Sequence, residues 1–218
     1  MEKFILSTDS TCDMPMSYYE ENEIVLSPLT FIMEGKEYGG EGLPQMDDKE
    51  FYSKLKNGSM PKTSQITLDG ALQKLEPFAK ENKPLLHIAF SSGLSGTYNS
   101  FLLASEELKE KYPDWNVIVI DSLCASMGEG LYLDYAVTLR NEGKSMEETA
   151  EILERDKQKL CHFFTVNNLF HLQRGGRVSK VSAVFGSMLG IKPVLHVNNE
   201  GKLIPIAKVR GRKASLDY

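Results

Sequence analysis

The chain has 218 residues, a length that suits one large domain or two small ones and allows a buried core. Hydrophobic residues make up 41% and charged residues 25%, which excludes a disordered or fibrous protein. No apolar run approaches the ~20 residues of a membrane span, and no apolar leader follows Met1. Cys12, Cys124 and Cys161 lack the spacing of disulfides or a zinc site. We therefore expect a cytoplasmic protein without stable membrane insertion.

Charge is distributed unevenly along the chain. The formal net charge is −5, which argues against a general nucleic-acid binder. Residues 171–218 carry nine Lys and Arg and two acidic residues, a net of +7, which leaves 16 basic and 28 acidic residues and a net of −12 in residues 1–170. The sequence thus has an acidic body and a basic end, which is either solvated or faces an anion or acidic partner.

Short apolar runs alternate with helical patterns over the first 160 residues. The extended runs are residues 4–6, 24–32 with a break at Pro28, 85–90 and 117–120. The helical patterns are residues 47–56, 67–78, 97–108, 127–139 and 145–160. Asp47 and Thr67 are predicted N-caps, and Ser145 with Glu148 forms a capping box. This alternation predicts an α/β fold, with a parallel sheet that carries helices on both faces.

The pattern changes after Cys161. A strand over 163–166 leads to a Gly-Arg-rich turn and a short helix near 181–189. Two strands, 191–197 and 202–209, are joined by a hairpin-type turn at 198–201. We therefore expect an N-terminal α/β domain over residues 1–160 and a second, smaller α/β domain over residues 161–218.

Polar residues stand where three predicted strands end, at residues 8–11, 91–93 and 121–122. Ligands of open parallel sheets bind at this edge. The second of these strand ends continues as Ser-Ser-Gly-Leu-Ser-Gly-Thr over residues 91–97 and opens a helix, so its free N–H groups and the Ser95 hydroxyl are suited to an anion. Simple capping of the helix by Ser and Thr explains the segment equally well. No Lys follows the glycine, which excludes a P-loop, and the spacing excludes the nucleophile elbow.

Arginines and histidines offer further candidates. Arg174 and Arg177 flank a Gly-Gly turn, and Arg210 opens a second Arg-Gly-Arg-Lys cluster; each cluster is either a solvated loop or a site for carboxylate or phosphate. The four histidines are dispersed, and none pairs at metal-ligand spacing. His87 lies in a predicted strand and is expected in the core. Cys12 has no evident activating base.

Several stretches match one family in family order. They are residues 8–13, 61–65, 91–100, 121–122 with 125–128, 172–179, 191–195 and 201–214. Together these motifs make the chain resemble the DegV family of bacterial fatty-acid-binding proteins. The resemblance implies two α/β domains, a long-chain fatty acid as ligand, and no other cofactor. Family members usually continue past the Arg-Gly-Arg-Lys stretch, so the second domain is expected to be truncated.

The resemblance also implies a role. Family members present the fatty-acid carboxylate to a separate ATP-dependent fatty-acid kinase, so the expected protein is a carrier in phospholipid metabolism, with neither catalytic residues nor a metal. The family's carboxylate-binding residues match Thr63 and Ser95. Its arginines near the carboxylate and the kinase-facing surface resemble Arg174, Arg177 and Arg210. Four further small residues are expected to bind the fatty acid: Ser64, Ser92, Gly96 and Ser126.

Two other functions stay open from the residues alone. A small-molecule hydrolase or phosphotransferase could use Ser95, but it needs a general base nearby, and the sequence offers no convincing one. A DNA-binding regulator could use the basic end, but it needs a helix-turn-helix, and no helix pair has that form.

Overall fold

The computed structural model describes residues 3–167, 169–178 and 190–218. Its central sheet is parallel, with the strand order β2-β1-β6-β7. The strands are β1 (Ile5–Asp9), β2 (Ile24–Ser27), β6 (Leu85–Ala89) and β7 (Val117–Asp121). Every residue of β6 is buried, as expected for a parallel strand covered on both faces. The strands predicted at 4–6, 85–90 and 117–120 are confirmed, whereas the extended run predicted over 24–32 forms two strands in different sheets, β2 and residues 30–33.

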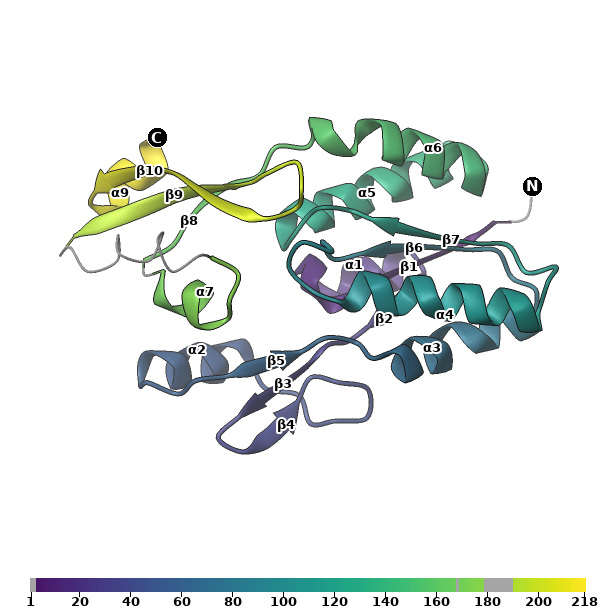
Figure 1. The fold of residues 1–218 in the computed structure, drawn as a ribbon, viewed down its shortest axis with the longest axis horizontal. Helices are drawn as coiled ribbons and strands as arrows, with labels where there is room; N and C mark the ends of the chain where they lie inside the picture. The colour runs from purple at the N-terminus through teal and green to yellow at the C-terminus, as the bar shows by residue number, and fades with distance from the viewer. Residues whose placement is uncertain (1–2, 168, 179–189) are drawn as a thin grey trace.

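Helices cover both faces of this sheet (Figure 1). On one face, α3 (Leu68–Lys80) and α4 (Thr97–Lys111) enclose a core that contains Phe101 and Trp115. On the other face, α1 (Met16–Glu21), α5 (Met127–Asn141) and α6 (Met146–Asp156) enclose a core that contains Tyr132 and Leu133. The predicted α/β class is therefore confirmed.

Side-chain caps start three helices where the sequence predicts them. Asp47 caps α2 (Asp48–Lys56), Thr67 caps α3, and Ser145 with Glu148 forms a complete capping box on α6. The helix predicted over residues 145–160 is shorter in the structure. Its α-helical part, α6, ends at Asp156 and continues only as the 3-10 helix η2 (Lys157–Lys159).

A second sheet, with the order β4-β3-β5, was not predicted. Its antiparallel strands are β3 (Thr30–Met33), β4 (Lys36–Tyr38) and β5 (Lys62–Ser64). Glu34 and Gly35 both have positive φ, which gives the tight hairpin turn between β3 and β4. Strands β4 and β5 have three residues each, too few for an alternating pattern to be recognised.

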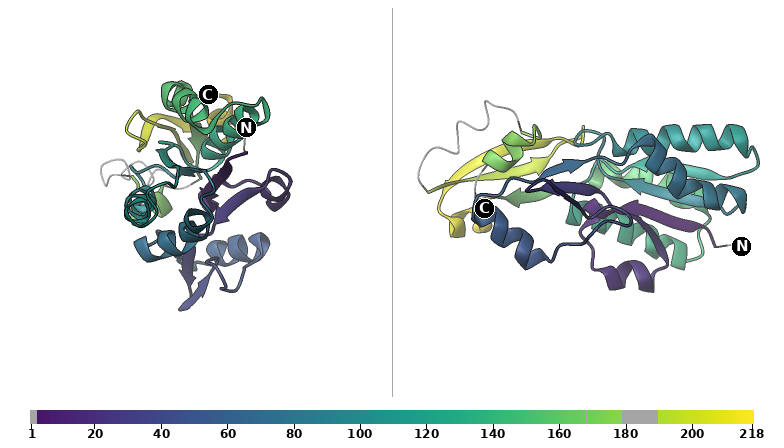
Figure 2. Two further views of the ribbon diagram at one scale, coloured as in Figure 1. Left: turned by 90° about the vertical axis from the view of Figure 1, so that its right-hand side faces the viewer. Right: turned by 90° about the horizontal axis from the view of Figure 1, so that it is seen from below.

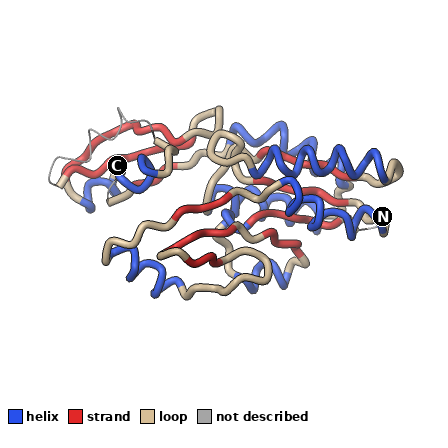
Figure 3. The backbone as a smooth tube through the Cα atoms, turned by 60° about the horizontal axis from the view of Figure 1, so that its bottom comes forward, coloured by secondary structure: helices blue, strands red, loops and turns tan. Residues whose placement is uncertain are grey.

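The third sheet, with the order β10-β9-β8, lies at the opposite end of the long axis from most of the central sheet (Figure 2). It contains β8 (Phe163–Thr165), β9 (Ile191–Val197) and β10 (Leu203–Arg210). A small core with Leu169, Val178 and Leu195 lies against it. Two short helices of this part, α7 (Phe170–Arg174) and α9 (Arg212–Asp217), were not predicted. The helix predicted near 181–189 lies outside the described residues. Figure 3 shows the strands as three separate groups.

Candidate functional site

Three parallel strands end side by side at one edge of the central sheet, since β1 pairs with β6 and β6 with β7. Asp9 at the end of β1 accepts a hydrogen bond of 2.9 Å from the backbone N–H of Phe90. Asp121 at the end of β7 accepts one of 3.1 Å from the N–H of Ser92. The two carboxylates therefore fasten residues 91–97, here called the serine loop, to the sheet.

The serine loop makes a tight turn before α4 begins. The N–H groups of Leu94 and Ser95 both bond the carbonyl oxygen of Ser91, at 3.0 and 3.1 Å. Gly96 occupies the N-cap position of α4, and no side chain caps the helix there. The Ser95 hydroxyl instead accepts the N–H of Thr97, the first residue of this 15-residue helix, at 3.2 Å, and the helix start carries partial positive charge toward the loop.

Ser95 belongs to a short chain of hydroxyl groups. Its Oγ accepts a bond of 3.2 Å from the backbone N–H of Thr97 and lies 3.0 Å from Thr97 Oγ1. Thr97 Oγ1 in turn accepts a bond of 3.4 Å from the N–H of Ile66. When Thr97 donates its proton to Ser95, the Ser95 O–H is left to donate to an incoming anion.

The predicted partner of Ser95, Thr63, lies on β5 and is exposed. Ser64 follows it and pairs with β3. The next residue, Gln65, lies against the start of α4, because a Cβ added at Gly96 would overlap the Gln65 side-chain oxygen. Together with the bond from Ile66 to Thr97, this contact holds β5 beside the serine loop.

The other two predicted serines differ in position. Ser92 is exposed in the serine loop. Ser126 stands at the start of α5, which packs on the opposite face of the sheet from α4, and its hydroxyl donates a 2.6 Å bond to Asp13. The structure therefore brings Ser92 together with Ser95, but it does not bring Ser126 to them.

Two of the three predicted arginines contact the serine loop or the segment before β5. Arg177 Nε donates a 3.1 Å bond to the carbonyl oxygen of Leu94, the residue before Ser95. Arg174 Nη1 lies 2.6 Å from Met60 Sδ, in the segment that leads into β5. Both arginines are exposed.

Arg210 is the third predicted arginine, and it lies apart from the other two. It ends β10, opposite Ile191 at the start of β9. The turn of this hairpin contacts the serine loop through a hydrogen bond between Ser91 and Gly201. Arg210 lies nine residue steps along the extended chain from Gly201, a span of about 30 Å at ~3.3 Å per step. The structure therefore does not bring Arg210 to the serine loop.

Two carboxyl groups are buried where β1 ends. Glu129 in the first turn of α5 and Asp9 are both fully buried. Thr11 Oγ1 lies between them, 2.5 Å from Asp9 Oδ1 and 2.8 Å from Glu129 Oε2. Burial, together with the charge of Asp9, raises the pKa of Glu129 well above its usual range. Burial also raises the pKa of the neighbouring Cys12 thiol, so this thiol is not a reactive thiolate near neutral pH.

His87 has the core position predicted for it. Its ring stacks on Phe101 at 3.7 Å, its Nδ1 lies 3.0 Å from Ser7 Oγ, and burial lowers its pKa to about 3. Across the described part of the chain, no three His, Cys, Asp or Glu side chains are placed to hold a metal ion. No helix in the described ranges is long and apolar enough to cross a membrane.

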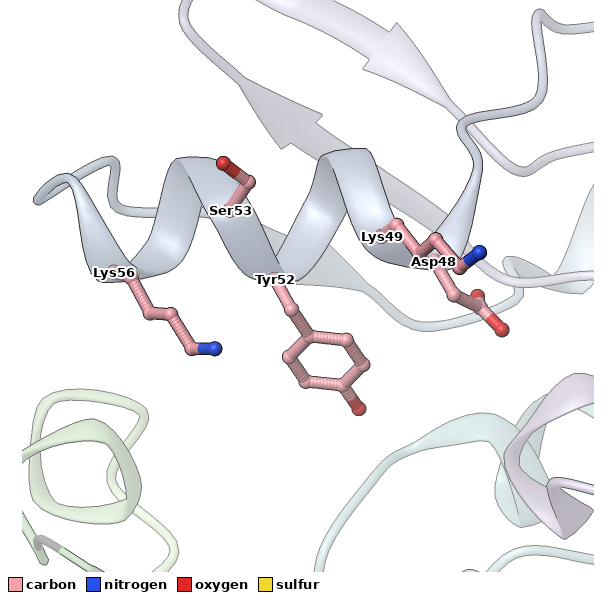
Figure 4. A pocket seen from close by; sticks show the side chains of 5 residues that line it. All are labelled: Asp48, Lys49, Tyr52, Ser53 and Lys56. Carbon is pink, nitrogen blue, oxygen red and sulfur yellow. The ribbon is translucent and has the colours of Figure 1, made fainter.

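A cavity of about 490 Å³ lies along α2 and is lined by Asp48, Lys49, Tyr52, Ser53 and Lys56. Figure 4 shows the Tyr52 and Lys56 side chains projecting from the same side of this helix. Four of the five lining residues are polar or charged, and none is a predicted site residue. This cavity is therefore not the predicted fatty-acid site.

Sequence reasoning missed two site features. Gln65 contacts the start of α4, and Thr97 connects Ser95 to the β5–α3 segment. A signal existed for both residues, since each lies within a matched stretch, 61–65 or 91–100, that already contained a predicted site residue. Their contacts across the fold were not visible in the sequence.

Comparison with known proteins identifies relatives over nearly the whole chain. Residues 3–218 match the model of the DegV family, which is described as a family of uncharacterised proteins. A DegV domain-containing protein of Clostridium perfringens is 44% identical, over 99% of this chain and 74% of the relative.

Solved structures give the same picture. A stearic-acid-binding protein from Eubacterium ventriosum superposes with a TM-score of 0.89 at 27% identity, over 98% of this chain and 73% of that one. DegV of Bacillus subtilis, a fatty-acid-binding protein, superposes with a TM-score of 0.81 at 31% identity, over 100% of this chain and 75% of that one.

Proposed function

This chain belongs to the DegV family, and from that premise we propose that it binds a long-chain fatty acid and presents the carboxylate to a separate ATP-dependent fatty-acid kinase. Thr63 and Ser95 hold the carboxylate in this proposal. Ser64, Ser92 and Gly96 are the other proposed fatty-acid-binding residues, whereas Ser126 is not among them, because α5 packs on the opposite face of the sheet from α4 and the Ser126 hydroxyl donates to Asp13. The protein is then a cytoplasmic lipid-binding carrier without a cofactor, and the kinase performs the phosphorylation.

One observation supports this proposal: the hydroxyl-bearing serine loop lies next to an apolar core. Arg177 bonds the serine loop through Leu94, and the next residue, Val178, is buried in the small core of the third sheet. Leu169 and Leu195 belong to the same core. A ligand with an anionic head at Ser95 and an apolar tail matches this arrangement. The structural neighbours from Eubacterium ventriosum and Bacillus subtilis, whose names state fatty-acid binding, support it.

The energetics favour such a ligand. A sixteen-carbon acid has about 14 methylenes, and burial of each is worth ~0.8 kcal/mol, roughly 11 kcal/mol before association costs. The carboxylate must then be hydrogen-bonded, because burial without partners cancels much of that gain. Hydroxyls and a helix N-terminus supply such bonds without a fixed counter-ion, which leaves a carboxylate oxygen free for phosphorylation.

The hand-over step rests on the arginines. Arg174, Arg177 and Arg210 are all exposed, and guanidinium groups bind phosphate oxygens and acidic surfaces through a planar set of N–H donors. The net charge of +7 over residues 171–218 favours an acidic partner. The partner- or phosphate-facing role of Arg174 and Arg177 is part of the proposal, as is a partner-facing role of Arg210.

The test compares palmitate with methyl palmitate on the wild type, Ser95→Ala and Thr63→Ala. Loss of one hydrogen bond to a charged group costs about 1.5–3 kcal/mol, so each variant is expected to bind palmitate roughly 10- to 150-fold more weakly. The ester carries no charge, and its binding is expected to change much less. Thr138→Ala, on an exposed position of α5, is the matched control. Equal losses for acid and ester would show that these hydroxyls do not hold the carboxylate.

A further inference from the structure

The turn between β9 and β10 inserts against the serine loop. Ser91 Oγ donates a hydrogen bond of 2.8 Å to the carbonyl oxygen of Gly201, and Ser91 is fully buried. The turn is held in shape by Asn198, whose Oδ1 accepts bonds from the N–H groups of Glu200 and Lys202 at 3.1 and 2.9 Å. A pre-formed turn of the third sheet thus binds the first residue of the serine loop.

Two glycines make this contact possible. Gly201 has φ +70°, and a Cβ there would overlap Ser91 Oγ and lie 3.2 Å from the Leu123 Cα. A Cβ at Gly93, inside the serine loop, would lie 2.5 Å from the carbonyl oxygen of Glu200. The two backbones therefore approach more closely than any other residue type allows at these positions.

A second contact holds the other side of the loop. The guanidinium of Arg177 donates through Nε to the Leu94 carbonyl oxygen at 3.1 Å, and through Nη1 to the carbonyl of Gly175. Leu94 is 8% exposed and directly precedes Ser95. Arg177 thus uses two of its N–H donors within the protein. One of them holds Leu94, the residue next to Ser95, which is proposed to bind the fatty-acid carboxylate.

We propose that Arg177 and the turn at 198–201 are positioning elements, which set the serine loop so that Ser95 meets the fatty-acid carboxylate. This inference rests on the proposed function and adds to it that the site is assembled only when the third sheet docks on the loop. Coupling of this kind is reciprocal, so bound fatty acid strengthens the docking by the same factor by which docking strengthens binding.

The first test is a double-mutant cycle. Arg177→Met removes the donor but keeps an unbranched apolar side chain, and it is expected to weaken palmitate binding roughly 10-fold or more while methyl palmitate changes little. If Arg177 acts by positioning Ser95, its effect vanishes in Ser95→Ala, and the double variant binds palmitate as Ser95→Ala does. Additive losses would mean that Arg177 contacts the carboxylate itself, and no loss in the single variant would mean that it plays no part. Either result overturns the proposal.

The second test needs no ligand. Gly201→Ala disrupts the docked turn, whereas Gly143→Ala imposes the same left-handed backbone strain at φ +85°, where nothing lies within 4 Å of the added methyl. In hydrogen exchange, amides of the serine loop are expected to exchange faster in Gly201→Ala and in Arg177→Met than in Gly143→Ala. Equal exchange in all three overturns the docking. Should Gly201→Ala fail to fold, Arg177→Met still decides the comparison. A wild type that binds no palmitate would reject the proposed function, and the exchange measurement would then decide the docking alone.

Discussion

Glu129 is a buried carboxyl group whose protonation state follows from its contacts. Thr11 Oγ1 is within hydrogen-bonding distance of both Glu129 and Asp9, but a hydroxyl has one proton to donate. Burial raises the pKa of Asp9 too, but its backbone bonds from Thr11 at 3.0 Å and Phe90 at 2.9 Å oppose this shift, so Asp9 is the better anion of the two carboxyl groups. Thr11 therefore donates to Asp9 and accepts from a protonated Glu129.

This proton predicts a loss of stability with rising pH. An unfolded Glu releases its proton near pH 4.3, whereas burial and Asp9 raise the pKa of Glu129 in the folded protein. Glu129 thus lowers the free energy of unfolding by about 1.4 kcal/mol per pH unit, from pH ~4.3 up to the folded-state pKa. Glu129→Gln keeps a donor toward Thr11 and is expected to lack this slope. Its free energy of unfolding is therefore expected to rise relative to that of the wild type as pH increases. Urea unfolding of both proteins between pH 4.5 and 8 measures the difference.

The exposed Glu151→Gln on α6 is the control for loss of a solvated carboxylate. A constant difference between wild type and Glu129→Gln over this range would contradict a neutral Glu129. Nothing in the sequence indicates this role, because Glu129 lies in a Gly-Glu-Gly segment at the start of a predicted helix. Its burial arises only when α5 packs on the end of β1.

At the scale of single elements, the start of α6 offers a direct measurement. Ser145 Oγ accepts the N–H of Glu148 at 3.1 Å, and Glu148 Oε2 accepts the N–H of Ser145 at 2.9 Å. Ser145→Ala is expected to lower the free energy of unfolding by about 1 kcal/mol, whereas Ser145→Asp, which keeps a capping oxygen, is expected to lose little. Urea unfolding checks both. Equal losses in the two variants would show that the cap itself contributes nothing.

Elements with a strong local signal were predictable from the sequence. The capped helices α2, α3 and α6 and the apolar strands β6 and β7 carry their own evidence in periodicity and end residues. Strands β4 and β5 do not, since Lys36–Tyr38 and Lys62–Ser64 are short and largely exposed, and only their pairing with β3 makes them strands. For the same reason Thr63 could be named from a motif, while the strand that carries it and the contact of the following Gln65 with the start of α4 could not.

On the scale of the whole molecule, the charge asymmetry could be counted from the sequence, but the docking that connects the two ends could not. The basic residues of the C-terminal part include Lys192, Lys202 and Lys208 on the β9–β10 hairpin. The same hairpin ends in the turn that contacts the serine loop at Gly201. The contact depends on a close approach between the backbones of the serine loop and the 198–201 turn, which the pattern of residue types does not indicate. Hence the acidic body and the basic end meet at the proposed carboxylate site.

The two parts of the molecule are expected to differ in local stability. The strands β1 and β6 of the central sheet are buried almost throughout, whereas β9 is buried only at its centre and the residues of β10 alternate between half-buried and exposed. Local opening is easier where fewer apolar groups are buried. In native-state hydrogen exchange, amides of β9 and β10 are therefore expected to exchange faster than those of β1 and β6, with the change in protection near residue 160, the predicted boundary between residues 1–160 and 161–218.

Saturating palmitate should slow exchange in β9 and β10 more than in β1 and β6, because a ligand held between serine loop and third sheet stabilises the weaker part. Uniform protection along the chain would instead mean that the two parts unfold as one cooperative unit.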